Sequence, residues 1–507
     1  MSLTVQEAFD LQYRDRLFIG GEWVAPSTSA LIDVVNPATE AVIFQVADAQ
    51  AEDVDRAVTA ARSAFDQGPW PRLSHAERAE YLRAIAAGLR KRVEQIATIH
   101  SSEMGILYRE ALYGPPWAAA RYDYYAGLVD DFPFIERHVP QDGGKLSLLV
   151  REPVGVVGMI VPWNGALTII APKLAAALLA GCTVVLKAAS GAPGEPLIMA
   201  EIAEEVGLPA GVLNVITAER EVSELLVRDP RVDKISFTGS TTAGRRIASI
   251  VGERIGRLTL ELGGKSAAIV LDDYDMEAAA TALAASGARM TGQVCASLSR
   301  IVVPRKRHDE FVEALSDAFS AVKVGDPFDP AVGMGPLVSS RQRDTVERYV
   351  AIGQQEGAKL TTGGGRPEHL DRGFFIEPTV FADVDNSSKI AQEEIFGPVL
   401  SVIPADDERH AVGIANDSIY GLNATVFSND IDRVYEVARR LQSGTVGHNA
   451  FRSDFDLAFG GFKQSGIGRD GGHEGLYGYV EPKTVVLEEE PSIFNTNTSN
   501  PEEGVQS

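Results

Sequence analysis

Apolar residues recur at helical spacing in the first part of the chain. Val54, Val58 and Ala61 fall three or four positions apart, which predicts an amphipathic helix. Farther along, Ser74 is followed three positions later by Glu77, which is a capping-box signature and predicts the start of a second helix. This part of the sequence therefore predicts helices that each bury one apolar face.

From Pro153 onward the pattern changes, because short, continuously apolar runs alternate with helical segments. The predicted strands are Val154–Val161, Thr183–Leu186, Val212–Ile216, Lys234–Phe237 and Leu258–Leu262. The predicted helices are Ala166–Ala180, Pro196–Val206, Glu221–Val227 and Thr241–Val251. This alternation predicts an α/β fold with a doubly wound parallel sheet that helices cover on both faces. Such sheets bind ligands beyond the carboxyl ends of their strands, although no G-x-G-x-x-G sequence is present here.

A second α/β run follows the first. Its predicted strands are Ala267–Leu271, Ser299–Val303, Phe375–Val380, Val399–Pro404 and Ala424–Phe427, and its predicted helices are Met276–Arg289 and His308–Val322. The extended stretch Phe132–Val150 predicts a separate hairpin, and Lys483–Leu487 predicts a last strand after the glycine-rich loop Phe459–Gly466. From Glu488 onward the composition is acidic and rich in Asn, Ser and Pro, which predicts a mobile tail.

The charge and the cysteine content exclude several classes of protein. The net charge is −23 over 507 residues, and we expect neither nucleic acid nor a membrane surface as a partner because that field repels both. Two cysteines, Cys182 and Cys295, favour a reducing compartment, for which we expect the cytoplasm. The longest apolar stretch, Ala166–Cys182, is interrupted by Pro172 and Lys173 and is too short to span a bilayer. The polar N-terminus lacks the pattern of a signal peptide, and the eight histidines show no metal-ligand spacing, so we expect no metal.

One carboxylate and one cysteine stand out as candidates for chemistry. Glu261 follows an apolar run and opens a Gly-Gly turn, and Cys295 follows a Gly-Gln-Val sequence. A cysteine and a carboxylate suit two-step covalent catalysis, in which a thiolate attacks and a base then activates the water that releases the product. A lone cysteine is more often a small core residue, and we keep that interpretation for Cys182, which lies between Gly181 and an apolar strand.

Several segments, taken in order, resemble the aldehyde dehydrogenase superfamily. They are Pro162–Asn164, the strand that ends at Lys187, Phe237–Gly244, Glu261–Lys265, Gly292–Cys295, Glu393–Pro398 and the loop from Phe459. One such motif would be weak evidence, whereas the ordered set covers roughly residues 15–490 and is specific. The resemblance implies a Rossmann-like cofactor domain at 1–132 and 152–262, a catalytic domain at 263–478, an oligomerisation arm at 133–151 and 479–489, and a tail at 490–507.

The resemblance also implies the chemistry. It makes Cys295 the nucleophile and Glu261 the base, with the Asn164 amide and the Cys295 backbone N–H as the oxyanion hole. Losing one such donor costs on the order of 10²–10³ in turnover. An alternative is acyl transfer to coenzyme A, and Glu261 argues against it because a thiol acceptor needs no activated water. A non-catalytic binding or structural member is a third reading, against which the presence of both residues argues.

The cofactor that the resemblance implies is NAD or NADP. The residues expected to bind it are Trp163, Lys187, Ser190, Gly239, Ser240, Gly244, Leu262, Glu394 and Phe396. Lys187 is expected at the adenosine ribose, Ser240 at the pyrophosphate on a helix N-terminus, and Glu394 at the nicotinamide ribose. NAD-preferring relatives carry Glu where this chain has Ser190. A neutral hydroxyl leaves room for a 2′-phosphate, so we expect NADP to be used as well.

The resemblance implies that the small-molecule partner is an aldehyde, and the sequence around Asn164 predicts the size of that aldehyde. Gly165 and Ala166 stand where many relatives have an aromatic residue, so we expect a wide substrate site. Such a site predicts a bulky, apolar aldehyde, either aromatic or terpenoid-like. The expected apolar wall and mouth of the substrate site are Leu167, Ile169, Phe451, Phe455 and Leu457, with Arg452 as the one possible charge.

The edge of Thr484–Val486 needs a partner strand, which predicts a homo-oligomer, either a dimer or a tetramer.

Overall fold

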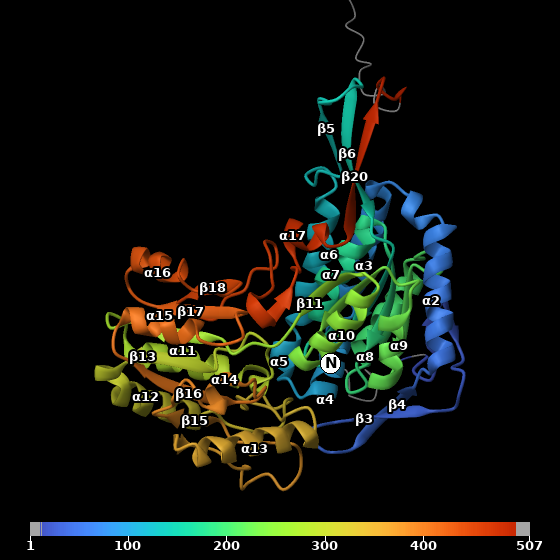
Figure 1. The fold of residues 1–507 in the computed structure, drawn as a ribbon. Helices are drawn as coiled ribbons and strands as arrows, with labels where there is room; N and C mark the ends of the chain where they lie inside the picture. The colour runs from blue at the N-terminus through green and yellow to red at the C-terminus, as the bar shows by residue number, and fades with distance from the viewer. Residues whose placement is uncertain (1–10, 12, 493–507) are drawn as a thin grey trace, which may run out of the picture.

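The computed structural model describes residue 11 and residues 13–492. The N-terminal segment that lacks a signal-peptide pattern, and all but the first three residues of the predicted tail 490–507, lie outside these residues. Two α/β bodies lie side by side, and a three-stranded sheet projects from one of them (Figure 1). In the part of the chain that the structure describes, no helix is both long and apolar enough to cross a membrane.

The first body is built on an eight-stranded sheet of order β19-β11-β10-β7-β8-β9-β1-β2. Its strands are β1 (Leu17–Ile19), β2 (Glu22–Val24), β7 (Val156–Ile160), β8 (Thr183–Ala188), β9 (Leu213–Thr217), β10 (Lys234–Thr238), β11 (Arg257–Glu261) and β19 (Gly466–Ile467). The central five, β7 to β11, are parallel. The chain runs outward from β7 to β8 and β9 on one side and to β10 and β11 on the other. The sheet is therefore doubly wound, as predicted, and its switch point lies between β7 and β10.

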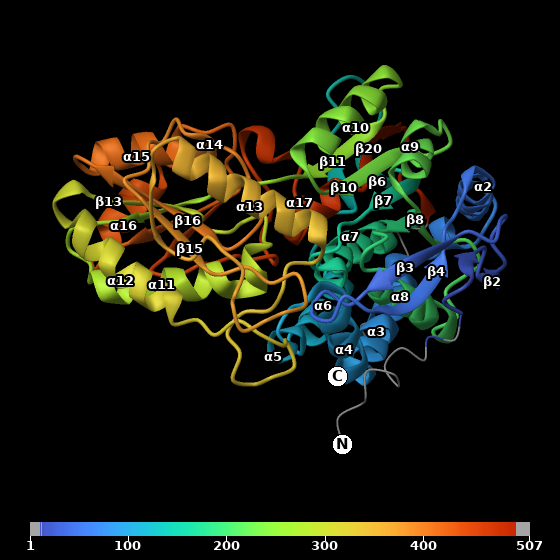
Figure 2. The ribbon, with the colours of Figure 1, turned by 90° about the horizontal axis from the view of Figure 1, so that it is seen from below.

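Helices cover both faces of this sheet because its strands are apolar on both sides. Val157 and Met159 pack into one core and Val156 and Ile160 into another, as alternation along β7 requires. On the first face lie α3 (His75–Lys91), α4 (Val93–Met104), α6 (Gly114–Gly127), α7 (Ala166–Ala180) and α8 (Gly194–Glu205). On the second face lie α2 (Ala51–Asp66), α9 (Arg220–Arg228) and α10 (Thr241–Glu253) (Figure 2). Cys182 is fully buried in the first core, which confirms its predicted place.

Sequence signals set several of these boundaries. Ser74 accepts a hydrogen bond from the Glu77 backbone N–H and Glu77 reciprocates, so the predicted capping box is confirmed at the start of α3. Ser240 likewise caps α10 by accepting from the Ala243 N–H at 3.3 Å. Gly181 ends α7 in the left-handed region, where a residue without Cβ is favoured.

The second body contains a seven-stranded sheet of order β14-β15-β16-β13-β12-β17-β18. The strands are β12 (Ala267–Val270), β13 (Arg300–Pro304), β14 (Lys359–Thr362), β15 (Thr379–Ala382), β16 (Val399–Ala405), β17 (Asn423–Phe427) and β18 (Thr445–His448). Helices α11 (Met276–Ala288) and α12 (His308–Ser320) cover one face. The other face is covered by α13 (Ser340–Gln355), α14 (Lys389–Gln392), α15 (Glu408–Asn416) and α16 (Ile431–Ala438).

One predicted strand of this sheet is largely wrong. The run Phe375–Val380 was expected to be extended, but β15 begins only at Thr379. Phe375 and Ile376 are apolar because they are buried in the cores on the two faces, not because they pair in the sheet. Pro378, which has no backbone N–H to donate, precedes the point where pairing starts.

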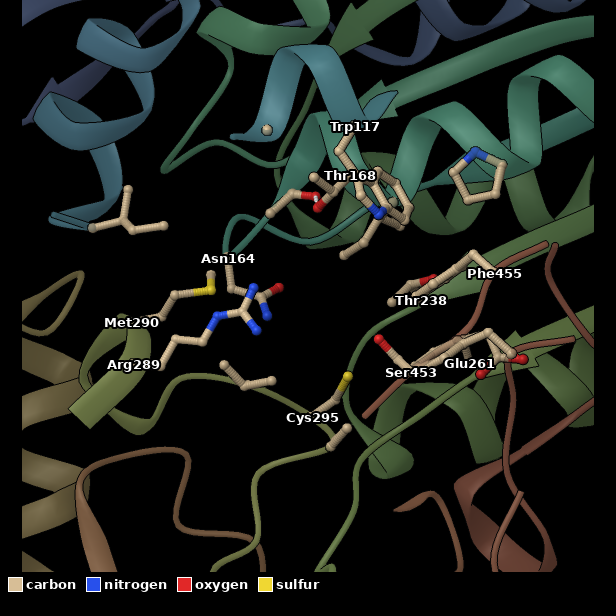
Figure 3. Close-up of a pocket in the computed structure, with 18 of the residues that line it drawn as sticks. Trp117, Asn164, Thr168, Thr238, Glu261, Arg289, Met290, Cys295, Ser453 and Phe455 are labelled. Atoms are coloured by element: carbon tan, nitrogen blue, oxygen red, sulfur yellow. Dashed lines mark hydrogen bonds between the residues drawn. The ribbon is translucent and has the colours of Figure 1, made fainter. Parts of the chain in front are cut away.

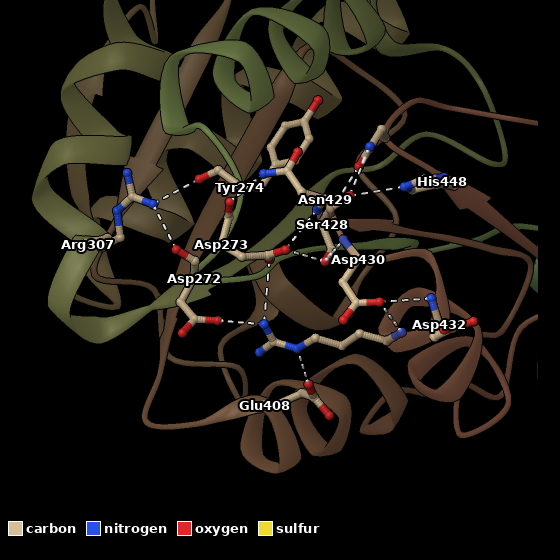
Figure 4. Close-up of polar contacts among 12 residues, drawn as sticks. Asp272, Asp273, Tyr274, Arg307, Glu408, Ser428, Asn429, Asp430, Asp432 and His448 are labelled. Carbon is tan, nitrogen blue, oxygen red and sulfur yellow. Dashed lines mark hydrogen bonds and ion pairs between the residues drawn. The ribbon is translucent and has the colours of Figure 1, made fainter.

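The carboxyl ends of β12 and β17 are tied together by paired charges (Figure 4). The Asp273 carboxylate accepts from the Ser428 hydroxyl at 2.7 Å and from the Asn429 N–H at 2.8 Å. Arg433 forms ion pairs with Asp272 and Glu408, each at 2.8 Å. Because each of these carboxylates accepts a hydrogen bond or forms an ion pair within the network, we interpret this edge as structural.

The predicted hairpin is confirmed and forms the projecting sheet, in the order β20-β6-β5. Its strands are β5 (Ile135–His138), β6 (Leu146–Pro153) and β20 (Val480–Leu487), all antiparallel. Remaining short elements are β3 (Leu31–Val35), β4 (Val42–Ala47), α5 (Tyr108–Ala111) and α17 (Gly472–Tyr477), with 3₁₀ turns at Trp70–Arg72, Arg289–Gly292, Arg305–Arg307 and Lys463–Ser465. β5 and β20 are both edge strands, and Val486 is 54% exposed on β20.

Candidate active site

A cavity of about 240 Å³ brings the predicted catalytic residues together. Asn164 lies on one wall, and Cys295 and Glu261 lie on the other (Figure 3). Asn164 follows β7 and Glu261 ends β11, so both come from the carboxyl edge of the first sheet. Cys295 comes from the second body, after α11. The cavity therefore has walls from both bodies.

Cys295 is half-buried, and its backbone is held close to the Gly-Gly turn after Glu261. A Cβ at Gly264 would lie 2.4 Å from the Cys295 carbonyl oxygen, so only glycine allows this approach. Burial first, and the Glu394 and Glu261 carboxylates in addition, together raise the pKa of the Cys295 thiol to about 12. The thiol is thus neutral near pH 7 in this state and needs a base to become nucleophilic.

The Asn164 amide is fixed beside the segment that carries the cysteine. Its Nδ2 donates to the Gln293 backbone carbonyl at 3.0 Å, and the side chain is buried. Gln293 is itself held, because its Oε1 accepts from the Val338 N–H at 2.9 Å. An amide nitrogen carries two hydrogens. One is used here, which leaves the second for an oxygen bound at Cys295.

Glu261 is a buried carboxylate without a hydrogen-bond partner among the described residues. Burial raises its pKa well above the ordinary value, and nearby Asp470 raises it too, whereas Lys173 lowers it. Lys173 forms an ion pair with Asp470 at 2.7 Å and donates to the Ser236 hydroxyl at 3.2 Å. A carboxylate with a raised pKa is a stronger proton acceptor, which suits a general base.

The predicted cofactor residues lie mostly outside this cavity, along the carboxyl ends of the same strands. Lys187 lies opposite Ile160 in the register of β8 and β7, and it is buried with no ion pair among the described residues. Burial lowers the pKa of Lys187 to about 8, against the opposite pull of the Glu219 carboxylate. An unpaired buried donor at this edge fits ribose hydroxyls. Ser190 follows in the turn after β8 and is half-buried.

The turn after β10 is the place where the sequence predicts an anion site. Gly239 donates its N–H to the Glu261 carbonyl at 3.0 Å, and Ser240 is exposed at the N-terminus of α10. A Cβ at Gly244 would lie 2.5 Å from the Leu262 side chain, so glycine is needed for α10 to approach β11. Leu262 alone among the predicted cofactor residues also lines the cavity. Backbone N–H groups at such a helix start bind phosphate readily.

Glu394 and Phe396 lie on the second body and face the first. Glu394 accepts from the Gly264 N–H at 3.1 Å, and burial raises its pKa to about 7. The Phe396 ring meets the Trp163 ring edge-to-face, with centroids 5.5 Å apart. Phe396 adopts a positive φ of 58°, which aims its ring at Trp163 and is uncommon outside glycine. These contacts place both residues at the junction of the two bodies.

The predicted substrate wall needs correction. Gly165, Ile169, Phe451 and Phe455 do line the cavity. Leu167 does not, because it points into the core of the first body and is 1% exposed. The other predicted positions outside the lining are Ala166, which is buried, and Leu457 and Arg452, which are exposed. The cation in the wall is Arg289, which the sequence interpretation missed.

Sequence reasoning also missed other lining groups. They include His100, Glu110, Trp117, Thr168, Thr238, Ser453, Phe459 and Asp470.

Lys173 gave a sequence signal for one buried ion pair, because a charged residue inside an otherwise apolar helix needs a buried partner. Its partner Asp470 lies far along the chain in the glycine-rich C-terminal region, where sequence spacing gives no indication of the pairing.

Comparisons with known proteins agree on one family. The model of the aldehyde dehydrogenase family matches residues 23–485. Geranial dehydrogenase of Castellaniella defragrans is 44% identical over 93% of this chain and 98% of its own length. An aldehyde dehydrogenase of Mycobacterium tuberculosis, solved with NAD⁺, superposes with a TM-score of 0.91 at 46% identity, covering 93% of this chain and 98% of that one. Betaine aldehyde dehydrogenase of Staphylococcus aureus, also solved with NAD⁺, gives a TM-score of 0.93 at 37% identity, over 95% and 96%.

Proposed function

The chain belongs to the aldehyde dehydrogenase family, and from this premise we propose that it oxidises a bulky, apolar aldehyde to its carboxylic acid. It is an NAD-dependent enzyme, as its relatives and structural neighbours are. The observation that carries the proposal is the shared cavity of Cys295, Asn164 and Glu261. Aromatic side chains form much of the wall, with Trp117 edge-to-face on Phe455 at 5.1 Å. A relative named for geranial, a branched apolar aldehyde, supports this substrate class.

We propose the following roles for the residues. The Cys295 sulfur adds to the aldehyde carbon, and the proton of the thiol passes to a base. The oxygen that becomes negative accepts hydrogen bonds from the Asn164 amide and the Cys295 N–H. Lys187 and Ser240, at the ends of their strands, would hold NAD⁺, which would supply the hydride acceptor. Glu261 then takes a proton from water, and that water releases the acid from the cysteine thioester.

Buried polar groups around Glu261 support the deacylation step. Thr238 Oγ1 and Asp470 Oδ1 have no hydrogen-bond partner among the described residues, and both residues line the cavity beside Glu261. Unpaired buried groups of this kind commonly hold ordered water. Acyl transfer to coenzyme A needs none of these groups.

The test is NADH formation with a panel of aldehydes, with and without coenzyme A. We expect the highest kcat/KM for geranial or a substituted benzaldehyde, and no dependence on coenzyme A. A panel led by acetaldehyde or succinic semialdehyde would refute the bulky, apolar class. A requirement for coenzyme A would replace the hydrolytic mechanism, and no turnover of any aldehyde would favour a non-catalytic member.

The cofactor preference gives a separate prediction. NAD serves as cofactor, and we expect NADP⁺ to give a comparable or higher kcat/KM because Ser190 offers a hydroxyl where a carboxylate would repel a 2′-phosphate. Ser190→Glu is expected to lower kcat/KM for NADP⁺ about 10-fold or more, the loss typical of a charged hydrogen bond. A strong NAD⁺ preference that Ser190→Glu leaves unchanged would contradict the prediction.

We propose that the projecting sheet joins subunits. Its edge strands, β5 and β20, have unpaired backbone groups, and a second subunit can extend the sheet. A dimer or a dimer of dimers follows from this arrangement. The arm corresponds to the expected segments 133–151 and 479–489.

Two cysteines without a disulfide fit a reducing compartment, and we propose the cytoplasm.

A further inference from the structure

The helix that follows Asn164 begins at a residue that has no side chain to cap it. Asn164 lies two positions before α7, and the N-cap residue between them is Gly165. Backbone N–H groups in the first turn of a helix have no partner within the helix, so they need acceptors from elsewhere. Asn164 and Thr168 both face the cavity from this end of α7 (Figure 3). The place where α7 begins therefore bears directly on where the Asn164 amide lies.

Glu195 supplies an acceptor for this helix from another helix. Its Oε2 accepts from the Leu167 N–H at 2.9 Å, and Leu167 is the second residue of α7. Glu195 itself lies in the first turn of α8, and its side chain is only 5% exposed. A carboxylate at a helix N-terminus is also favoured by the helix dipole. The start of α7 is thus held by a hydrogen bond that is shielded from water.

Two residues of α4 hold Glu195 in place. His100 Nδ1 lies 3.4 Å from Glu195 Oε1, which is the oxygen that Leu167 does not use. Glu103 accepts from the Gly194 N–H at 3.0 Å, so it caps α8 in the way that Glu195 caps α7. Both α4 side chains are buried. Because each of its oxygens has a contact and its backbone is anchored, the Glu195 carboxylate has little freedom to leave the α7 start.

The Asn164 amide has its own contact on the opposite side, with the segment that carries the nucleophile. It donates to the Gln293 carbonyl at 3.0 Å, two positions before Cys295. Asn164 is joined to α7 by Gly165 alone, so a shift of the helix start moves the amide relative to the cysteine. A misplacement of about 1 Å near a reacting centre can cost about 10²-fold in rate.

Resting on the proposed function, we propose that Glu195 is a positioning residue for the oxyanion hole. Glu195 does not line the cavity, and it acts by holding the start of α7 and, through it, the Asn164 amide against Cys295. Glu195 also begins the helix that follows the turn with Ser190. The same carboxylate therefore joins the turn expected at the cofactor to the amide expected at the substrate oxygen.

Two substitutions separate the reach of this side chain from its charge. Glu195→Gln keeps an oxygen at the same distance to accept from Leu167, whereas Glu195→Asp keeps the charge but is one methylene shorter. We expect the rate constant of the NADH burst, at saturating aldehyde and NAD⁺, to fall about 10-fold in Glu195→Asp, which is less than the loss of the whole donor. Glu195→Gln should stay close to the wild type. Glu277→Asp is the matched control, because Glu277 is an exposed residue in the first turn of α11, and it should change nothing.

A double-mutant cycle shows whether Glu195 acts through Asn164. In an Asn164→Ala background, Glu195→Asp is expected to slow the burst no further, because no amide is left to position. Equal fold losses in both backgrounds would overturn the proposal, since a general packing defect does not depend on Asn164. A weaker Kd for NAD⁺ that explains the whole loss would overturn it as well, because Glu195 would then act through the cofactor turn.

The remaining outcomes separate this proposal from the proposed function. If Asn164→Ala leaves the burst unchanged, the oxyanion role of Asn164 fails and the positioning role fails with it. If Asn164→Ala slows the burst but Glu195→Asp does not, only the positioning role is overturned. A Glu195→Gln variant as slow as Glu195→Asp also overturns it, because reach would then not matter. An NAD⁺ titration shows that each variant is folded, and Glu195→Ala, which removes the acceptor without adding volume, replaces Glu195→Asp in the cycle if the latter does not fold.

Discussion

Cys295→Ala is expected to abolish turnover, by on the order of 10⁴-fold or more, the scale seen when a covalent nucleophile is removed. No other thiol is present to take its place, because Cys182 is fully buried in the first body and does not line the cavity. Rapid mixing should show no burst of NADH, since hydride transfer follows attack by sulfur. The wild-type burst should become faster as pH rises, because the raised pKa of Cys295 keeps it a neutral thiol near pH 7.

Cys182→Ala is the matched control for this prediction. It removes the other thiol of the chain, whose sulfur lies 3.4 Å from the Tyr479 carbonyl in the core. We expect full turnover and a modest loss of stability from a small cavity. Steady turnover in Cys295→Ala would overturn the covalent mechanism altogether.

Glu261→Gln is expected to separate the two halves of the reaction. The substitution keeps the shape of the side chain and removes its basicity, so steady-state turnover should fall about 10²–10⁴-fold. A first burst of NADH, close to one per active subunit, should remain because the cysteine step precedes the need for water. The measurement is stopped-flow absorbance, followed by mass spectrometry of the trapped acyl-enzyme.

Two results would change the role of Glu261. Loss of the burst would mean that its carboxylate also takes the proton of the thiol. Glu261 is near enough to do so, since its carboxylate raises the pKa of Cys295. Unchanged steady turnover would mean that another group activates the water. Asp470 would then be the first candidate, since it lines the same cavity and its Oδ1 has no hydrogen-bond partner in the described part of the chain.

The parallel sheet of the first body could be predicted from sequence because its strands are buried on both faces and read as continuous apolar runs. The strand with Lys234–Phe237 and the helix Ala166–Ala180 agree with the structure to within a residue. Phe375–Val380 is similarly apolar, but most of this run is buried as irregular chain. Strand pairing begins only after Pro378. Apolar content alone does not distinguish the two cases.

The catalytic positions were accessible through ordered motifs, whereas the rest of the cavity was not. Arg289 lines the cavity at a turn in which Met290 and Thr291 adopt left-handed backbone angles, and neither residue type indicates such a turn. Lys173 and Asp470 meet only through the folding of distant segments. Leu167 was placed on the wrong side because a helix turns each residue by about 100°, so its neighbours Gly165 and Thr168 face the cavity instead.

The separation of the two cysteines has a consequence for oxidative damage. Cys182 is sealed in the core, and the half-buried Cys295 has no second cysteine in its cavity with which to form a protective disulfide. An oxidant that reaches the site converts Cys295 to a sulfenic acid, and further oxidation to the sulfinic form is irreversible without dedicated repair. Rescue of the first stage must come from a small thiol that enters from solution. The opening of the cavity admits the aldehyde, the oxidant and the rescuing thiol alike. It therefore sets both how fast the enzyme is inactivated and whether it recovers.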